Sequence, residues 1–318
     1  MIDVLKPTIF PLSEIVDVFV HMQKAHDTQR AYRHDIEQAL TSLGILNQNY
    51  HDLVALPIPE LHKRLVLFLS HLAKRDVHGH ILNSNTLSRK RYTLVKFFRF
   101  LMEVHGFPQN PAVSLPRYAI SERSNTPVIG EEELFQFLRA LSRRRSESQQ
   151  AFRDYLIVLG LFHFALRRKE LAGLKWSDIH PTPQPHFRVL QKRNRLKCLP
   201  IPPKYEKYLS EFALLHGKDS DFIFHPMRNN RTQNLDRPLS TTAIHDLVLR
   251  LGAEYLPGKK IMPHSFRATF ICLARKYHLD DRAIMNATGH RSGEMINYYD
   301  VREVLLANAI NHFGERIE

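Results

Sequence analysis

Residues 263–299 read PHSFRATFICLARKYHLDDRAIMNATGHRSGEMINYY, which places His264 and Arg267 near the start, His290 after a glycine, and Tyr299 at the end. Residues three apart on a helix share a face, so the first histidine and the arginine can reach the same point in space. A guanidinium and two imidazoles can hold anionic oxygens, and a phenol can attack phosphorus. The stretch therefore indicates chemistry on a phosphodiester.

The order and intervals of these residues resemble the tyrosine recombinase (phage integrase) family, which carries HxxR, then GH, then a nucleophilic tyrosine. Here 23 positions lead from Arg267 to His290, and nine lead from His290 to Tyr299. Tyr298 is the rival nucleophile, but adjacent residues on a helix point about 100° apart, so only one of the two tyrosines can face the cations. The nine-residue interval favours Tyr299.

A second stretch, residues 165–179, reads ALRRKELAGLKWSDI and resembles the family's first arginine motif, GLRxSELxxLxWxDI. The resemblance implies that Arg167 is the other catalytic arginine and that Glu170 orients the cationic cluster. Ala165 stands where the family has glycine, and Lys169 stands where it has a small residue.

Residues 186–201, HFRVLQKRNRLKCLPI, form two β-prone arms around a basic tip, which predicts a β-hairpin. The resemblance implies a catalytic lysine in this hairpin, often within GKG, and assigns it to Lys192. The residues on either side of Lys192 are not the usual glycines. Arg195 and Lys197 therefore remain alternatives for this cation.

The composition is basic, with a formal net charge of +13 and a pI of about 9.8. Lys and Arg exceed Asp and Glu by 15 to 11 in residues 1–125 and by 30 to 21 in the remainder. A basic excess in both halves favours a polyanionic partner such as nucleic acid. Two cysteines do not make a disulfide framework or a zinc site. We expect no metal or other cofactor, because two arginines supply the charge neutralisation that a metal gives in nucleases.

The first 20 residues are interrupted by four charged side chains, so we expect no signal peptide. The longest apolar run, residues 156–166, is too short to span a bilayer. These features predict a cytoplasmic, nucleoid-associated protein that has no contact with a membrane.

Periodicity and end signals predict a mostly α protein with a small β-sheet, an α+β fold. Residues 1–120 are expected to form a helical core-binding domain, 121–127 a linker, and 128–318 a catalytic domain with a C-terminal tail helix. The second helix is expected to begin at an Asp27 cap, and the fourth to follow Asn85 and to end at Gly106. Ser240 is expected to cap the helix at 241–251, and 222–224 to form a third strand. The predicted helices are 12–21, 28–43, 58–75, 86–105, 131–142, 148–166, 241–251, a helix opening at Pro263, and 279–287.

The predicted helix at 86–105 carries a basic cluster, Arg89, Lys90 and Arg91, beside an apolar stripe. Such a cluster is either a solvated face or a DNA-binding surface. The run resembles the last helix of the family's N-terminal core-binding domain, which implies DNA contact and a two-domain clamp around duplex DNA. Arg193 and Arg195, at the hairpin tip, are further DNA-binding candidates.

The resemblance implies a site-specific recombinase that breaks and rejoins DNA by transesterification, without ATP. Tyr299 would attack phosphorus and form a 3′-phosphotyrosyl intermediate. Arg167 and Arg267 suit the developing charge, because a planar guanidinium donates to two oxygens at once.

Proton transfers are assigned through the same resemblance. His264 would take the phenolic proton or hold a phosphate oxygen. His290 would donate to a nonbridging oxygen, and Lys192 would protonate the leaving 5′ oxygen. The residue chemistry permits each role.

The resemblance implies double-stranded DNA with a specific core site as one partner. The other partner is a further copy of this chain, as a dimer on the site and a tetramer in synapsis, or else a related recombinase. The same chemistry would also suit a type IB topoisomerase or a hairpin telomere resolvase. A catalytically silent architectural DNA-binding protein is the alternative from another class, and the complete set of catalytic residue types argues against it. Dimer resolution of the Xer type and integration of a mobile element both stay open.

Overall fold

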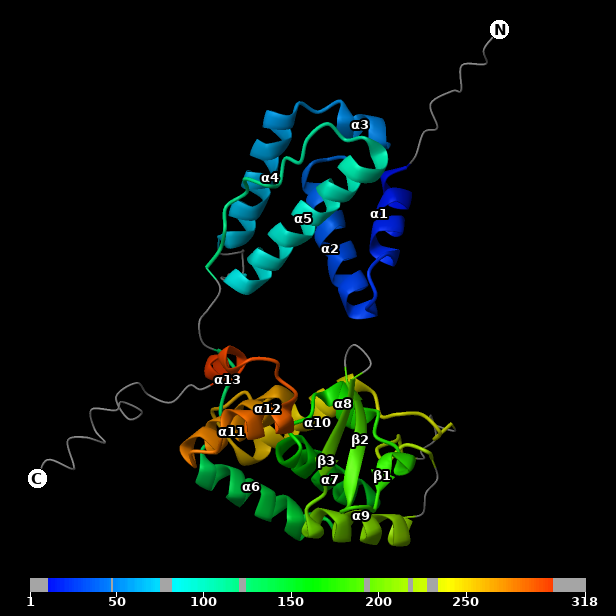
Figure 1. Ribbon diagram of the computed structural model, residues 1–318, viewed down its shortest axis with the longest axis vertical. Coiled ribbons are helices and arrows are strands. Elements are labelled where there is room, and N and C mark those ends of the chain that lie inside the picture. The colour runs from blue at the N-terminus through cyan, green and yellow to red at the C-terminus, as the bar shows by residue number, and fades with distance from the viewer. Residues whose placement is uncertain are drawn as a thin grey trace, which may run out of the picture. The chain divides into compact units, whose positions relative to one another are not determined.

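The computed structural model describes residues 11–46, 48–74, 82–119, 124–191, 195–216, 220–227 and 234–299, without the side chains of residues 190, 191, 195 and 299. The chain divides into two compact units, residues 1–121 and 122–318, which are described separately (Figure 1). The predicted α+β class is confirmed, because helices dominate and the described strands form one small sheet. No helix in the described ranges combines the length and apolar character needed to cross a membrane.

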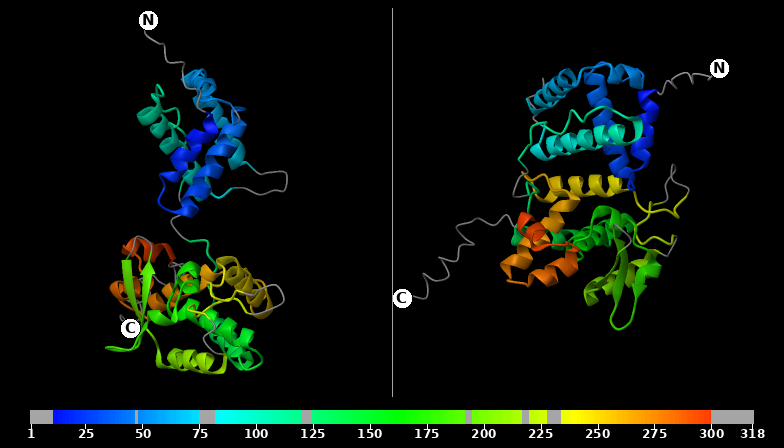
Figure 2. Two further views of the ribbon diagram at one scale, coloured as in Figure 1. Left: turned by 90° about the vertical axis from the view of Figure 1, so that its right-hand side faces the viewer. Right: turned by 45° about the horizontal axis from the view of Figure 1, so that its top comes forward.

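The first unit is a bundle of helices around one apolar core (Figure 2). The predicted helix at 12–21 is confirmed with the same bounds. The helix that ends at His105 stops where Gly106 takes a left-handed conformation with φ 68°, which an L side chain disfavours. The helices of the first unit are α1 (Leu12–His21), α2 (His26–Ser42), α3 (Tyr50–Val54), α4 (Ile58–Ala73) and α5 (Ser84–His105).

Two helix starts in this unit differ from the prediction. Asp27 does not cap α2, because the helix begins at His26 and Asp27 lies in its first turn. The cap of α5 is Asn83, whose side chain accepts a hydrogen bond from the backbone of Asn85. Several Asx residues near a helix start compete for this position, and the sequence alone does not rank them.

The second unit surrounds the long apolar helix α7 with other helices and one sheet. Ser240 caps α10 and Pro263 opens α11, as predicted. The helices are α6 (Glu131–Arg144), α7 (Gln149–His163), α8 (Arg168–Ala172), the 3₁₀ turn η1 (Trp176–Asp178), α9 (Pro203–His216), α10 (Thr241–Tyr255), α11 (Pro263–Lys276), α12 (Asp281–Thr288) and α13 (Gly293–Tyr299).

The sheet is an antiparallel strip at the edge of the helical body, in the order β1–β2–β3 (Figure 2). The hairpin of β2 (His186–Gln191) and β3 (Arg195–Pro200) confirms the prediction, and its inward side chains join the core around α7. The third strand was wrongly placed. It is β1 (Ile179–His180), whereas Phe222 makes only an isolated bridge to Lys175.

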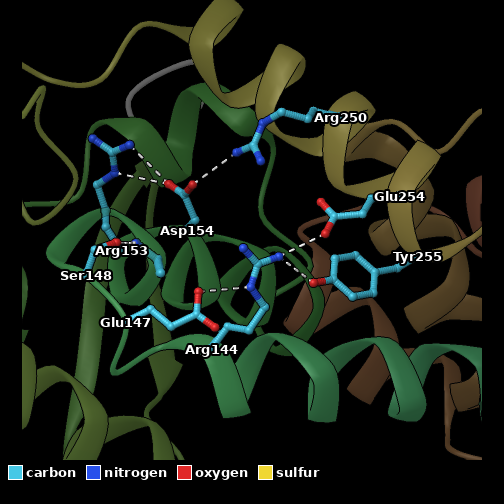
Figure 3. Close-up of polar contacts among 9 residues, drawn as sticks. Arg144, Glu147, Ser148, Arg153, Asp154, Arg250, Glu254 and Tyr255 are labelled. Carbon is cyan, nitrogen blue, oxygen red and sulfur yellow. Dashed lines mark hydrogen bonds and ion pairs between the residues drawn. The ribbon is translucent and has the colours of Figure 1, made fainter.

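Two polar networks hold α10 against α6 and α7 (Figure 3). Asp154 on α7 is buried and accepts from the adjacent Arg153 and from Arg250 on α10. Arg144 on α6 reaches both Glu254 and the hydroxyl of Tyr255, about one turn after Arg250 at the C-terminal end of α10. A buried carboxylate needs such cations, because an unpaired charge in the interior is costly.

Candidate active site

Arg167 lies at the N-cap of α8, where Glu170 fixes it from the first turn of the same helix. One carboxylate oxygen of Glu170 accepts from the Arg167 backbone at 2.9 Å, and the other accepts from its guanidinium at 2.8 Å. The Arg167 side chain remains 46% exposed, whereas that of Glu170 is only 9% exposed. Glu170 therefore orients the guanidinium from behind and leaves its other face toward solvent.

The turn before α8 keeps the conformation that a glycine would give it. Ala165 has φ 44°, in the left-handed region that favours glycine. Its carbonyl oxygen accepts from Nη1 of Arg267 at 2.6 Å. This turn therefore joins the first arginine motif to the second.

Arg267 lies on α11 and is only 1% exposed. Its Nη2 donates to Nε2 of His290 at 2.9 Å. Arg267 thus contacts the histidine that follows α12, 23 residues later in the chain. The guanidinium is held in one orientation, because it is buried and donates to two different segments, at Ala165 and at His290.

His290 follows Gly289, which ends α12 in a left-handed conformation with φ 74°. The hydroxyl of Thr288 donates to the carbonyl of Ile284, so Nδ1 of His290 must donate to the Thr288 oxygen, 3.0 Å away. Its Nε2 then accepts from Arg267. In this arrangement Nε2 must first gain a proton before His290 can donate to a phosphate oxygen, and it then no longer accepts from Arg267.

The electrostatics show that these groups share one neighbourhood. Burial, followed by the charges of Arg267 and Arg167, lowers the pKa of His264 to about 4. Burial and the same two guanidiniums, with smaller contributions from His264 and Lys197, lower the pKa of His290 to about 3. Both imidazoles are therefore neutral near pH 7 and can accept a proton.

Among the described residues, Lys197 on β3 is a lysine of this cluster. It is 9% exposed, and its ammonium donates to the carbonyl of Ala287 in the last turn of α12. Burial is the largest cause that lowers its pKa to about 7; the charge of Arg267 adds to it, and Glu170 opposes it. The sequence offered Lys197 only as an alternative, because its burial depends on the packing of β3 against α12.

Four predicted residues lie partly or wholly outside the described residues. Lys192 and Arg193 belong to the segment 192–194, and only the backbone of Arg195 is described. Tyr299 ends α13, and its side chain is likewise not described. The rival Tyr298 is partly buried and packs against the small apolar cluster formed by α11, α12 and α13.

The basic cluster on α5 is engaged inside the first unit. Lys90 is 3% exposed, and its ammonium donates to Asp35 and Gln38. This burial argues against the predicted DNA contact of Lys90, because its charge neutralises the fully buried Asp35. Arg89 also pairs with Asp35 but keeps 38% of its side chain exposed, and Arg91 donates to backbone carbonyls of the segment after α5.

Among the described residues, no group of three or more His, Cys, Asp or Glu side chains could hold a metal ion. The charges that gather here are instead cationic, on Arg167, Arg267 and Lys197, with Glu170 as the nearby carboxylate. Such a site binds an anion and can exchange protons with it.

Known tyrosine recombinases resemble this chain in sequence and in fold. A tyrosine recombinase of Pseudothermotoga lettingae is 25% identical over 297 residues, which cover 91% of this chain and 92% of that protein. Crystal structures with the same fold include the XerH recombinase bound to a palindromic difH substrate (TM-score 0.66, 18% identity, 94% of this chain and 83% of that one). They also include a lambda integrase tetramer bound to a Holliday junction (TM-score 0.65, 16% identity, 93% and 80%).

The model of the phage integrase family matches residues 127–303, which is more than half of the 318 residues. The match includes both arginine motifs, the hairpin and the two tyrosines. The chain belongs to the phage integrase family.

Proposed function

We propose that this chain is a site-specific DNA recombinase, which cleaves and rejoins DNA strands through a covalent phosphotyrosyl intermediate. The observation that carries the proposal is the convergence of Arg167, Arg267, His264, His290 and Lys197 from four separate segments. A protein that only binds DNA needs cations on its surface, but it does not need a buried arginine bonded to a neutral histidine.

In the first step the oxygen of Tyr299 attacks phosphorus, and the bond to the 5′ oxygen breaks. The phenolic proton passes to His264, whose neutral ring can accept it, or to water. Arg167 and Arg267 stabilise the charge on the nonbridging oxygens, and loss of one such donor typically slows a reaction about a hundredfold or more. The 3′-phosphotyrosyl bond conserves the energy of the phosphodiester, so rejoining needs no ATP.

The leaving 5′ oxygen takes a proton from a lysine of the hairpin. Lys192 holds this role by family resemblance. The burial of Lys197 beside both arginines supports it as the second candidate, because a pKa of about 7 suits a general acid near neutral pH. Glu170 positions Arg167 and takes no proton in this scheme.

Double-stranded DNA with a specific core site is the proposed substrate. The similarity to recombinases bound to DNA supports self-association on that site, including a tetramer in synapsis. Arg89, Arg91, Arg193 and Arg195 remain proposed DNA contacts. Since its substrate is DNA, we place the protein in the cytoplasm with the nucleoid.

The test uses a duplex library with a randomised, nicked centre, because the core sequence is unknown. The wild-type protein should form an adduct that survives denaturation, and sequencing of the trapped DNA should give one preferred site. Tyr299→Phe should abolish the adduct, and Tyr298→Phe is the matched control that should keep it. An adduct that persists in Tyr299→Phe, or an absence of any adduct with the wild type, would refute the proposed function.

A further inference from the structure

A cationic cavity of about 390 Å³ lies beside the catalytic cluster, between β3 and α12. His290 and Lys197 line both the cavity and the cluster, so the two sites are continuous. The remaining lining residues are Leu196, Arg282, Met285, Asn286, Gly289 and Arg291.

The lining carries positive charge without a carboxylate. Arg282 and Arg291 are exposed, and neither guanidinium has an ion pair or hydrogen bond within the described part of the chain. The two nearby carboxylates are already engaged. Asp280 accepts from backbone groups at the start of α12, and Asp281 pairs with Arg275. The two arginines therefore remain available to an external anion.

The backbone at the cavity also leaves room for a ligand. Gly289 lines it in a left-handed conformation and has no side chain to fill the space. The amide of Asn286 is exposed on the same side and can donate a neutral hydrogen bond. Two forked cations and an amide suit the oxygens of a phosphate group.

We infer that this cavity binds a backbone phosphate of the DNA strand next to the phosphate that is cleaved, with Arg282 and Arg291 as its ligands. The inference rests on the proposed function. A DNA strand carries one phosphate for every rise of about 3.4 Å, so a strand seated at Arg267 and His290 brings neighbouring phosphates to adjoining cations. This contact fixes the register of the strand, because it holds the phosphate beside the reacting one.

The first experiment measures binding to a 30-bp duplex of arbitrary sequence as a function of salt, by fluorescence anisotropy. The plot of log K against log salt has a negative slope, and Arg282→Ala/Arg291→Ala should make that slope less negative by about 0.9, the value for one phosphate contact. Arg139→Ala/Arg143→Ala, on α6, makes the same charge change and should leave the slope unchanged. Equal slopes for the wild type and the cavity variant, or an equal fall in the α6 control, would overturn the inference.

The second experiment uses the duplex selected with the randomised library and places one neutral methylphosphonate at each phosphate around the cleavage site. For the wild type, one such linkage next to the scissile phosphate should slow adduct formation about tenfold or more. In Arg282→Ala/Arg291→Ala the same linkage should have no further effect, because the contact is already lost. If the slowing caused by the methylphosphonate and the slowing caused by the two substitutions add at every linkage, the inference is contradicted and the proposed function stays intact. A wild type that forms no adduct refutes the proposed function itself.

Discussion

Lys197 offers a quantitative test of the site, because its ammonium is buried beside two arginines. Its folded-state pKa of about 7 lies below the value of 10.5 for a free lysine. The unfolded chain therefore binds one more proton than the folded chain between pH 7 and 10.5, and the free energy of unfolding rises with pH in that window. Each pKa unit corresponds to about 1.4 kcal/mol, so the full effect is about 5 kcal/mol.

Lys197→Met keeps most of the side-chain volume and removes the titrating group. The difference in unfolding free energy, wild type minus variant, should rise by roughly 1.4 kcal/mol per pH unit above pH 7. The lost hydrogen bond to Ala287 shifts this difference by a constant and does not change its slope. The protein contains a single tryptophan, Trp176, which packs against the core of the second unit, so its fluorescence reports the unfolding of that unit alone.

The assay is urea unfolding of both proteins at several pH values from 6 to 10. Lys207→Met is the matched control, since 74% of the Lys207 side chain is exposed and its difference from the wild type should stay flat. A flat difference for Lys197→Met as well would refute the claim that burial in this cluster lowers the pKa of Lys197.

Three further predictions test other parts of the structure. A substrate with sulfur in place of the leaving 5′ oxygen tests whether Lys192 is the general acid, because a thiolate leaves without a proton. This substrate should restore cleavage to Lys192→Ala but not to Lys197→Ala. The reverse result would assign the role to Lys197. Asp35→Asn should destabilise the first unit by about 3 kcal/mol in circular dichroism melts, because it strands a buried ammonium, and an unchanged melt would contradict that pairing. His264 and His290 have folded pKa values of about 4 and about 3, below the usual 6.5, so stability should fall as pH drops from 6.5 toward 4. The double glutamine variant should lose this pH dependence of the Trp176 unfolding midpoint, and an unaltered dependence would show that other groups cause it.

Local signals in the sequence predicted much of the fold. The bounds of α1, the stop at Gly106, the cap at Ser240 and the start of α11 at Pro263 depend on a few adjacent residues. The wrong strand at 222–224 has a different origin. An isolated β-prone segment becomes a strand only if a neighbouring backbone pairs with it, and here that partner is limited to Lys175.

The sequence by itself determined the chemical inventory of the site, because the intervals between the arginines, histidines and tyrosines are linear properties of the chain. Only the tertiary structure decided which cations are available for chemistry. Lys90 and Lys197 both look like surface lysines in the sequence, yet one is neutralised by Asp35 from another helix and the other is buried against the end of α12. Burial and pairing depend on segments that are distant in the chain, and those contacts set the charge state of each group.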